Sequence, residues 1–197
     1  MAERFAGWNE IDVELVPSLE HPFSTNIISA NKAMHSEFIE GFELDTNWHD
    51  YAIFWTPDYI SWFLDGKQVR RVEHTEVVDF INKPCHLAMS LWTPTTGSWA
   101  EGFEEVDMPW YADYDYVETY TWNGNGFDLH WRDDFHTFDE TRWKVANGWG
   151  YNGNSSTFYS SQVNVQGGQL HLKLEPSSWT DEIEDDDREK NYQNFIQ

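Results

Sequence analysis

Three carboxylic acids occupy alternate positions near the start of the chain, in Glu10-Ile11-Asp12-Val13-Glu14. Side chains alternate between the two faces of a β-strand, so these acids are expected to share one face. The Cα atoms of Glu10 and Glu14 would lie roughly 13 Å apart at about 3.3 Å per residue. Their side chains must lean together to bring the carboxyl groups to about 5 Å, the separation that suits hydrolysis of a glycosidic bond with retention of configuration. Such a reaction needs one ionised and one protonated carboxyl group, and neighbouring acids with unequal pKa values supply them.

The same spacing also fits a solvated outer face of an acidic protein, and the spacing alone favours neither interpretation over the other. Trp8 falls on the predicted acid face, and solvated faces rarely need tryptophan, which favours a functional face. On the opposite face, Ile11, Val13 and Leu15 are expected to point into an apolar layer that supports the acids.

The composition is typical of a single all-β domain. The 197 residues include 17% aromatic residues and 12 Trp, and short runs of β-formers alternate with Gly, Asn, Asp and Pro. The net charge of −23 argues against nucleic acid and anionic membranes as partners but is compatible with neutral sugars, which stack on aromatic rings. Cys85 is the only cysteine, so it forms no intramolecular disulfide, and we expect it to be small and buried.

The elements that must position the acids are short strands separated by turn residues. Asp65-Gly66 predicts a hairpin with a type I′ turn, and a second hairpin is predicted across Gln166-Gly167-Gly168. Asn123-Gly124-Asn125-Gly126 is predicted to be a loop, and residues 177–197 an acidic, mobile tail. No apolar stretch reaches membrane-spanning length, and the first residues lack the features of a signal peptide. Besides the acidic strand, the predicted strands are 26–30, 51–55, 59–64, 68–73, 86–92, 115–122, 160–165 and 169–174, which together indicate a sandwich or barrel.

The segment Trp8-Asn9-Glu10-Ile11-Asp12-Val13-Glu14, the Trp-rich strands and the acidic balance resemble glycoside hydrolase family 16, and within it the lichenases, which are endo-1,3-1,4-β-glucanases. The resemblance implies an all-β fold, a β-jelly-roll sandwich of the concanavalin A-like type. It also implies that Glu10 is the nucleophile, that Glu14 is the general acid/base, and that Asp12 orients Glu10.

Further positions resemble residues that contact the glucan in that family. Asn26 follows the catalytic strand by one strand, Leu91-Trp92 and Trp99 resemble cleft-lining residues, and residues 147–154 resemble a sugar-binding loop. The sugar-binding residues that the resemblance implies are Trp8, Asn26, Trp92, Trp99, Trp149 and Asn152.

The order of these segments differs from that in most of the family. The loop at 147–154 follows the catalytic strand instead of preceding it, as does Asp133-Asp134-Phe135, which resembles the usual opening strand. The chain therefore resembles a circularly permuted member, one domain over residues 1–176 with a join near 123–126. Two or three family strands have no counterpart here, which implies either truncation at the N-terminus or strands supplied by a second chain.

Lichenases hold a structural calcium, and the resemblance assigns it to the Asp115 carboxylate with carbonyls of Asp134 and Gly168; oxygen ligands suit this ion. The alternative is that Asp115 is an ordinary surface residue. The eight histidines show no metal-ligand spacing, and the two-carboxylate reaction needs no metal cofactor.

The sequence thus predicts a retaining endo-β-glucanase that hydrolyses mixed-linkage 1,3-1,4-β-glucan. The alternatives are a non-catalytic or truncated glucan-binding protein and a relative acting on xyloglucan or 1,3-β-glucan. By resemblance, the protein is expected to be secreted or extracellular, although this chain shows no signal peptide.

Overall fold

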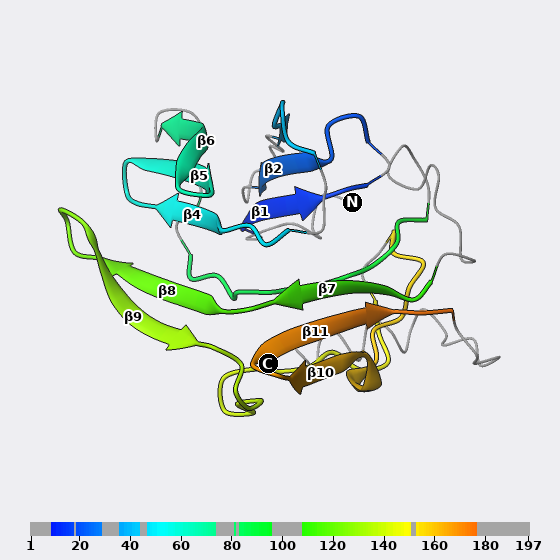
Figure 1. Ribbon diagram of the computed structural model, residues 1–197. Helices are drawn as coiled ribbons and strands as arrows, with labels where there is room; N and C mark the ends of the chain where they lie inside the picture. The colour runs from blue at the N-terminus through cyan, green and yellow to red at the C-terminus, as the bar shows by residue number, and fades with distance from the viewer. Residues whose placement is uncertain are drawn as a thin grey trace. The chain divides into compact units, whose positions relative to one another are not determined.

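The computed structural model describes residues 9–17, 19–28, 36–43, 47–73, 81, 83–95, 108–150 and 153–176. In this part of the chain the strands pair antiparallel, and the one helix is a short 3-10 turn (Figure 1). The prediction of an all-β fold is confirmed. None of these residues forms a helix long and apolar enough to cross a membrane. The predictions for Trp8, Trp99, Asn152 and the acidic tail lie outside the described residues.

The chain divides into two compact units, Met1–Ala88 and Met89–Gln197, which are described separately. The first contains two three-stranded sheets (Figure 1). One sheet is ordered β1 (Glu10–Leu15), β2 (Phe23–Ile28) and β3 (Glu37–Phe38), and the other is ordered β4 (Tyr51–Trp55), β5 (Tyr59–Leu64) and β6 (Lys67–Glu73).

The two sheets of the first unit pack against each other through an apolar core. Ile27 of β2 and the β5 residues Ile60 and Trp62 are fully buried in it. Ile11 and Val13 of β1 pack against this core, as their alternation with the acids predicts. The acid strand therefore has an apolar support on one face.

Two polar side chains also connect the sheets of this unit. The Trp62 indole N–H donates a hydrogen bond to the Asp12 carbonyl oxygen at 2.9 Å, which ties the backbone of β1 to β5. The buried Arg70 guanidinium of β6 donates to the Thr25 carbonyl at 3.0 Å and to its hydroxyl at 2.9 Å. The same guanidinium lies 4.8 Å from the centre of the Trp62 ring. Buried donors that find such partners fix the register of β1 and β2 against the second sheet.

The predicted hairpin at Asp65-Gly66 is confirmed. These two residues join β5 to β6 with φ angles of 50° and 75°, the left-handed backbone that a type I′ turn requires. The prediction that 166–168 joins two paired strands is confirmed as well, because Gln166 pairs with Gln169 across Gly167 and Gly168.

The second unit contains a three-stranded sheet and a two-stranded hairpin. The sheet is ordered β10 (Val163–Gln166), β11 (Gln169–Leu174) and β7 (Trp110–Tyr114), and the hairpin pairs β8 (Val117–Trp122) with β9 (Phe127–Asp133). Phe135, Leu170 and Leu172 form its buried core. The predicted loop Asn123–Gly126 is confirmed as the turn between β8 and β9, in which the Asn123 side-chain oxygen accepts from two backbone N–H groups.

Several local predictions are wrong. Residues 86–92 form no strand among the described residues, because β-propensity cannot supply a neighbouring strand with which to pair. The strand predicted at 115–122 begins at Val117, and residues 160–165 begin with the 3-10 turn Ser160–Gln162. Strand β2 begins at Phe23, before the predicted start at Asn26, and residues 29 and 30 lie outside the described residues. Leu15, at the end of β1, is 43% exposed because the apolar layer ends before it.

Candidate active site

The acids of β1 lie beside two buried polar residues of β2. The antiparallel register pairs Asp12 with Asn26 and Glu14 with Ser24, and directly paired side chains share a face of the sheet. Ser24 and Asn26 are only 1% and 3% exposed. The predicted acid face therefore exists, but it is partly buried, and a solvated outer face is not what the structure shows.

Asp12 is the most perturbed of the three acids. Burial, followed by the charge of Glu10 and a hydrogen bond to it and then by the charge of Glu14, raises the pKa of Asp12 to about 9. A hydrogen bond with Asn26 acts in the opposite direction. Asp12 is therefore protonated at neutral pH and can donate to Glu10, so that the row does not carry three full negative charges.

Glu14 is held by a specific donor. The Ser24 hydroxyl donates to a carboxylate oxygen of Glu14 at 2.9 Å. Burial raises the pKa of Glu14, and the charge of Glu10 adds to that increase, whereas the hydrogen bond from Ser24 lowers it. The row thus contains two carboxyl groups, Asp12 and Glu14, that keep a proton to higher pH than exposed acids do.

We expect Ser24→Ala to raise the pKa of Glu14 further, because the substitution removes the donor that stabilises the ionised carboxylate. Carboxyl ¹³C NMR titration of Glu14 measures this. Ser61 is a buried serine of β5, a strand of the other sheet, so Ser61→Ala controls for the loss of a buried hydroxyl. Ser24→Thr should retain the Glu14 pKa of the unmodified chain. A Glu14 pKa that stays constant or falls in Ser24→Ala would show that the hydrogen bond does not tune this acid.

Cys85 lies beside the acid strand, a position that the sequence could not predict. It is exposed, so the prediction of a buried thiol is wrong. Its sulfur lies 3.7 Å from the Asn9 carbonyl oxygen, directly before β1. Partial burial and the charge of Glu10 raise the pKa of the thiol, which therefore stays protonated at neutral pH and is a weak nucleophile.

The second unit contains the remaining described residues that the sequence assigns to sugar binding. Trp149 is 3% exposed, and its ring packs edge-on against Phe158 at 5.4 Å between centroids. Trp92 is partly buried and precedes Thr93, whose hydroxyl lies 2.6 and 2.8 Å from the hydroxyls of Ser155 and Ser156. Trp149 is thus a buried residue that packs within this unit.

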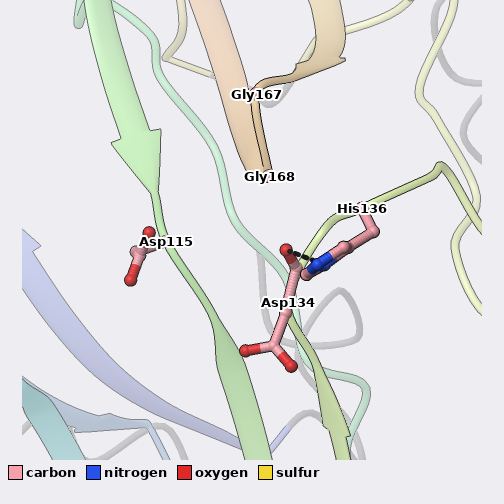
Figure 2. A pocket seen from close by; sticks show the side chains of 5 residues that line it. All are labelled: Asp115, Asp134, His136, Gly167 and Gly168. Carbon is pink, nitrogen blue, oxygen red and sulfur yellow. Dashed lines mark hydrogen bonds between the residues drawn. The ribbon is translucent and has the colours of Figure 1, made fainter.

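The three residues that the sequence assigns to calcium line one hollow of about 490 Å³ (Figure 2). A Cβ atom placed on Gly168 would lie 3.8 Å from the Asp134 carbonyl oxygen, so the two backbones approach closely. Figure 2 shows this carbonyl directed towards His136, whose Nδ1 lies 3.2 Å away, while the Asp134 carboxylate points in the opposite direction. Arg132 donates to that carboxylate at 2.6 Å.

Phe135, directly after Asp134, has a φ of 48° although it is not glycine. This left-handed backbone is costly for an aromatic residue, and the buried ring and a hydrogen bond from the Phe135 N–H to Asp133 maintain it. The strained residue sets the direction of the chain beside the hollow. Within the described residues, however, no three His, Cys, Asp or Glu side chains are grouped to hold a metal, so an ion here would depend on backbone oxygens.

Several known proteins resemble this chain in sequence. The family model of glycosyl hydrolases family 16 matches residues 1–112. A β-glucanase of Fibrobacter succinogenes is 29% identical over 177 residues, which cover 85% of this chain and 50% of that protein. A β-glucanase of Paenibacillus polymyxa is 33% identical over 118 residues, 59% of this chain and 47% of that protein. The chain thus spans about half the length of the curated relatives it matches.

Proposed function

The chain belongs to glycosyl hydrolases family 16, and from this premise we propose that it is a retaining endo-β-glucanase whose reacting groups are Glu10 and Glu14. The observation that carries the proposal is the row of acids on β1. Burial and the charge of Glu10 raise the pKa of both Asp12 and Glu14 in this row. A glycosidase needs a carboxylate and a carboxylic acid at the same pH. This row supplies both.

In the first step, a carboxylate oxygen of Glu10 attacks the anomeric carbon while the bond to the leaving sugar breaks. Glu14 gives its proton to the leaving oxygen, and a covalent glycosyl ester on Glu10 results. In the second step, Glu14 takes a proton from water as the water oxygen attacks the anomeric carbon, which frees Glu10. Protonated Asp12 donates to Glu10 and orients the attacking oxygen.

We propose mixed-linkage 1,3-1,4-β-glucan as the substrate. The names of the relatives support a β-glucan, and the linkage rests on the resemblance to lichenases. For sugar binding we retain Trp8, Asn26, Trp92, Trp99, Trp149 and Asn152 as proposed contacts. Asn26 has support from the structure, because its buried side-chain oxygen has no hydrogen-bond partner among the described residues and could accept from a sugar hydroxyl next to Asp12.

Release of reducing sugar from barley β-glucan, laminarin and xyloglucan tests this function. We expect release from barley β-glucan above all, and none with Glu10→Gln. Glu20→Gln, a change of an exposed carboxylate outside the row, should retain the activity. If the chain binds glucan without hydrolysing any of the three, it is the glucan-binding protein that the sequence leaves as an alternative; preferential cleavage of xyloglucan or laminarin identifies the other alternative.

We also propose that the chain is a circularly permuted jelly roll of one domain over residues 1–176. The extent of the matches supports this proposal: the family model ends at residue 112, whereas the alignment with the Fibrobacter succinogenes protein covers 177 residues. The turn Asn123–Gly126 is then the join between the ancestral termini. An experimental structure in which the units Met1–Ala88 and Met89–Gln197 are two domains, each with a complete sandwich of its own, would contradict this.

A structural calcium ion is a further proposal, with Asp115, Asp134 and Gly168 as its ligands. The donors fit a hard cation, because the residues lining the hollow offer a carboxylate and backbone carbonyls. The Asp134 carboxylate already accepts from Arg132, and the Asp134 carbonyl oxygen, which lies 3.2 Å from His136 Nδ1, has a second lone pair for an ion.

If calcium binds there, it should raise the melting temperature by about 5–10 °C at a concentration about 100 times its Kd. Thermal unfolding with calcium and with chelator measures this difference. We expect Asp115→Asn to reduce the calcium response and Asp58→Asn, in the other unit, to leave it unchanged. Equal melting temperatures with calcium and with chelator would contradict the site.

We propose an extracellular location, because a polymeric glucan cannot reach an enzyme inside a cell. Detection of the protein in the medium of its source organism tests this. Retention within the cells would contradict it.

A further inference from the structure

An aromatic side chain lies on the same face of the sheet as the acids, at its edge. The register pairs Phe38 of β3 with Ser24 of β2, and Ser24 in turn with Glu14 of β1. Directly paired residues share a face, and the hydrogen bond from Ser24 to Glu14 identifies that face as the acid face. Glu14, Ser24 and Phe38 therefore form one row across three strands.

Phe38 differs from Ser24 in its exposure. Ser24 is buried, whereas Phe38 is 47% exposed, so the row ends in an apolar ring that is open to solvent. Neighbouring strands lie about 4.8 Å apart, which puts the Cα atoms of Glu14 and Phe38 about 10 Å apart. That distance is comparable to the length of a disaccharide.

The short strand that carries Phe38 is fixed from its other face. Glu37 forms an ion pair with Arg70 at 3.2 Å, and Arg70 also donates to Thr25, the residue paired with Glu37. The Ile39 N–H donates to the Phe23 carbonyl at 2.8 Å. A two-residue edge strand with these anchors presents the Phe38 ring in a constant position, which lowers the entropic cost of using it as a binding surface.

We propose that Phe38 is a stacking surface for a glucosyl residue on the leaving-group side of the cleaved bond. This rests on the proposed function, in which Glu14 protonates the leaving oxygen, so the leaving chain begins at Glu14. A chain that crosses the strands along the row passes over Ser24 and reaches Phe38. The apolar C–H face of a sugar ring packs on an aromatic ring, and the exposed face of Phe38 offers one.

The test measures kcat/KM of the unmodified chain, of Phe38→Ala and of Phe38→Tyr, each on two substrates. A glucan oligosaccharide places sugars on both sides of the cleaved bond, whereas an aryl glycoside with the same non-reducing part has no sugar on the leaving side. We expect Phe38→Ala to lower kcat/KM for the oligosaccharide about five- to tenfold. Its kcat/KM for the aryl glycoside should stay within about twofold of that of the unmodified chain. Phe38→Tyr should retain both activities.

Trp48→Ala is the matched control, since Trp48 is an exposed aromatic residue of the same unit, and it should change neither activity. Equal losses on both substrates, or no loss on the oligosaccharide, would overturn the proposal. If the unmodified chain cleaves neither substrate, the proposed function fails, and calorimetric binding of the oligosaccharide then decides the role of Phe38. Weaker binding by Phe38→Ala than by Trp48→Ala supports the stacking surface, and equal binding overturns it.

Discussion

Substituting Glu10 by glutamine should lower kcat/KM for β-glucan by roughly 10⁴-fold or more, since loss of a nucleophile removes the covalent route altogether. The amide has nearly the same shape as the carboxylate but neither its charge nor its nucleophilicity. Folding should be retained, because the substitution removes a negative charge from a row of acids. Initial rates of reducing-sugar release, together with the melting temperature, measure both effects.

Glu20→Gln is the matched control for Glu10→Gln, because it makes the same chemical change on an exposed carboxylate outside the row. It should leave kcat/KM within about twofold. Comparable activity of Glu10→Gln and Glu20→Gln would remove Glu10 from the mechanism. Glu14 or Asp12 would then have to be considered as the attacking group.

Removal of the proton donor by Glu14→Ala should lower kcat/KM for β-glucan by about 10²- to 10⁴-fold, the range typical of general acid catalysis. The loss should be far smaller for an aryl glycoside such as the 2,4-dinitrophenyl compound, because its leaving group needs no proton. With such a substrate the second step becomes limiting, and the covalent intermediate should accumulate. Kinetics with leaving groups of decreasing pKa measure the difference.

The pH profile gives a second measurement of Glu14. A general acid acts only while it is protonated, and the pKa of Glu14 is raised by burial and by the charge of Glu10. The raised pKa keeps the proton on Glu14 to higher pH, so kcat/KM of the unmodified chain should decline at higher pH than an exposed glutamate would allow. Glu14→Ala should abolish this alkaline decline, and its persistence in the variant would assign it to another group.

The acid face could be predicted from the sequence because it depends only on strand alternation. Ile11 and Val13 alternate with the acids and pack in the core, as the period of two requires. The hairpin at Asp65-Gly66 was equally predictable, since its turn chemistry is local. Leu15 follows the same alternation but lies past the end of the apolar layer, and the extent of that layer is a tertiary property.

Ser24 and Phe38 could not be found in this way. Their place beside Glu14 depends on the register of β1, β2 and β3, and a shift of one residue would turn either side chain to the other face. The position of Cys85 next to Asn9 likewise depends on contacts between residues far apart in the sequence. Strand β9, by contrast, was missed although its apolar Phe, Leu and Trp alternate with polar Asp, His and Arg, the period-two pattern that predicts a strand.

In the proposed mechanism, Glu10 becomes covalently bonded to the sugar. An activated 2-deoxy-2-fluoro glucan oligosaccharide slows both steps, which lets the glycosyl ester persist, and peptide mass spectrometry of the inactivated protein then locates the label. We expect one fluorosugar per chain, attached to Glu10, and no label in Glu10→Gln. A label on another carboxylate, or hydrolysis with inversion of configuration and no labelled peptide, would contradict it.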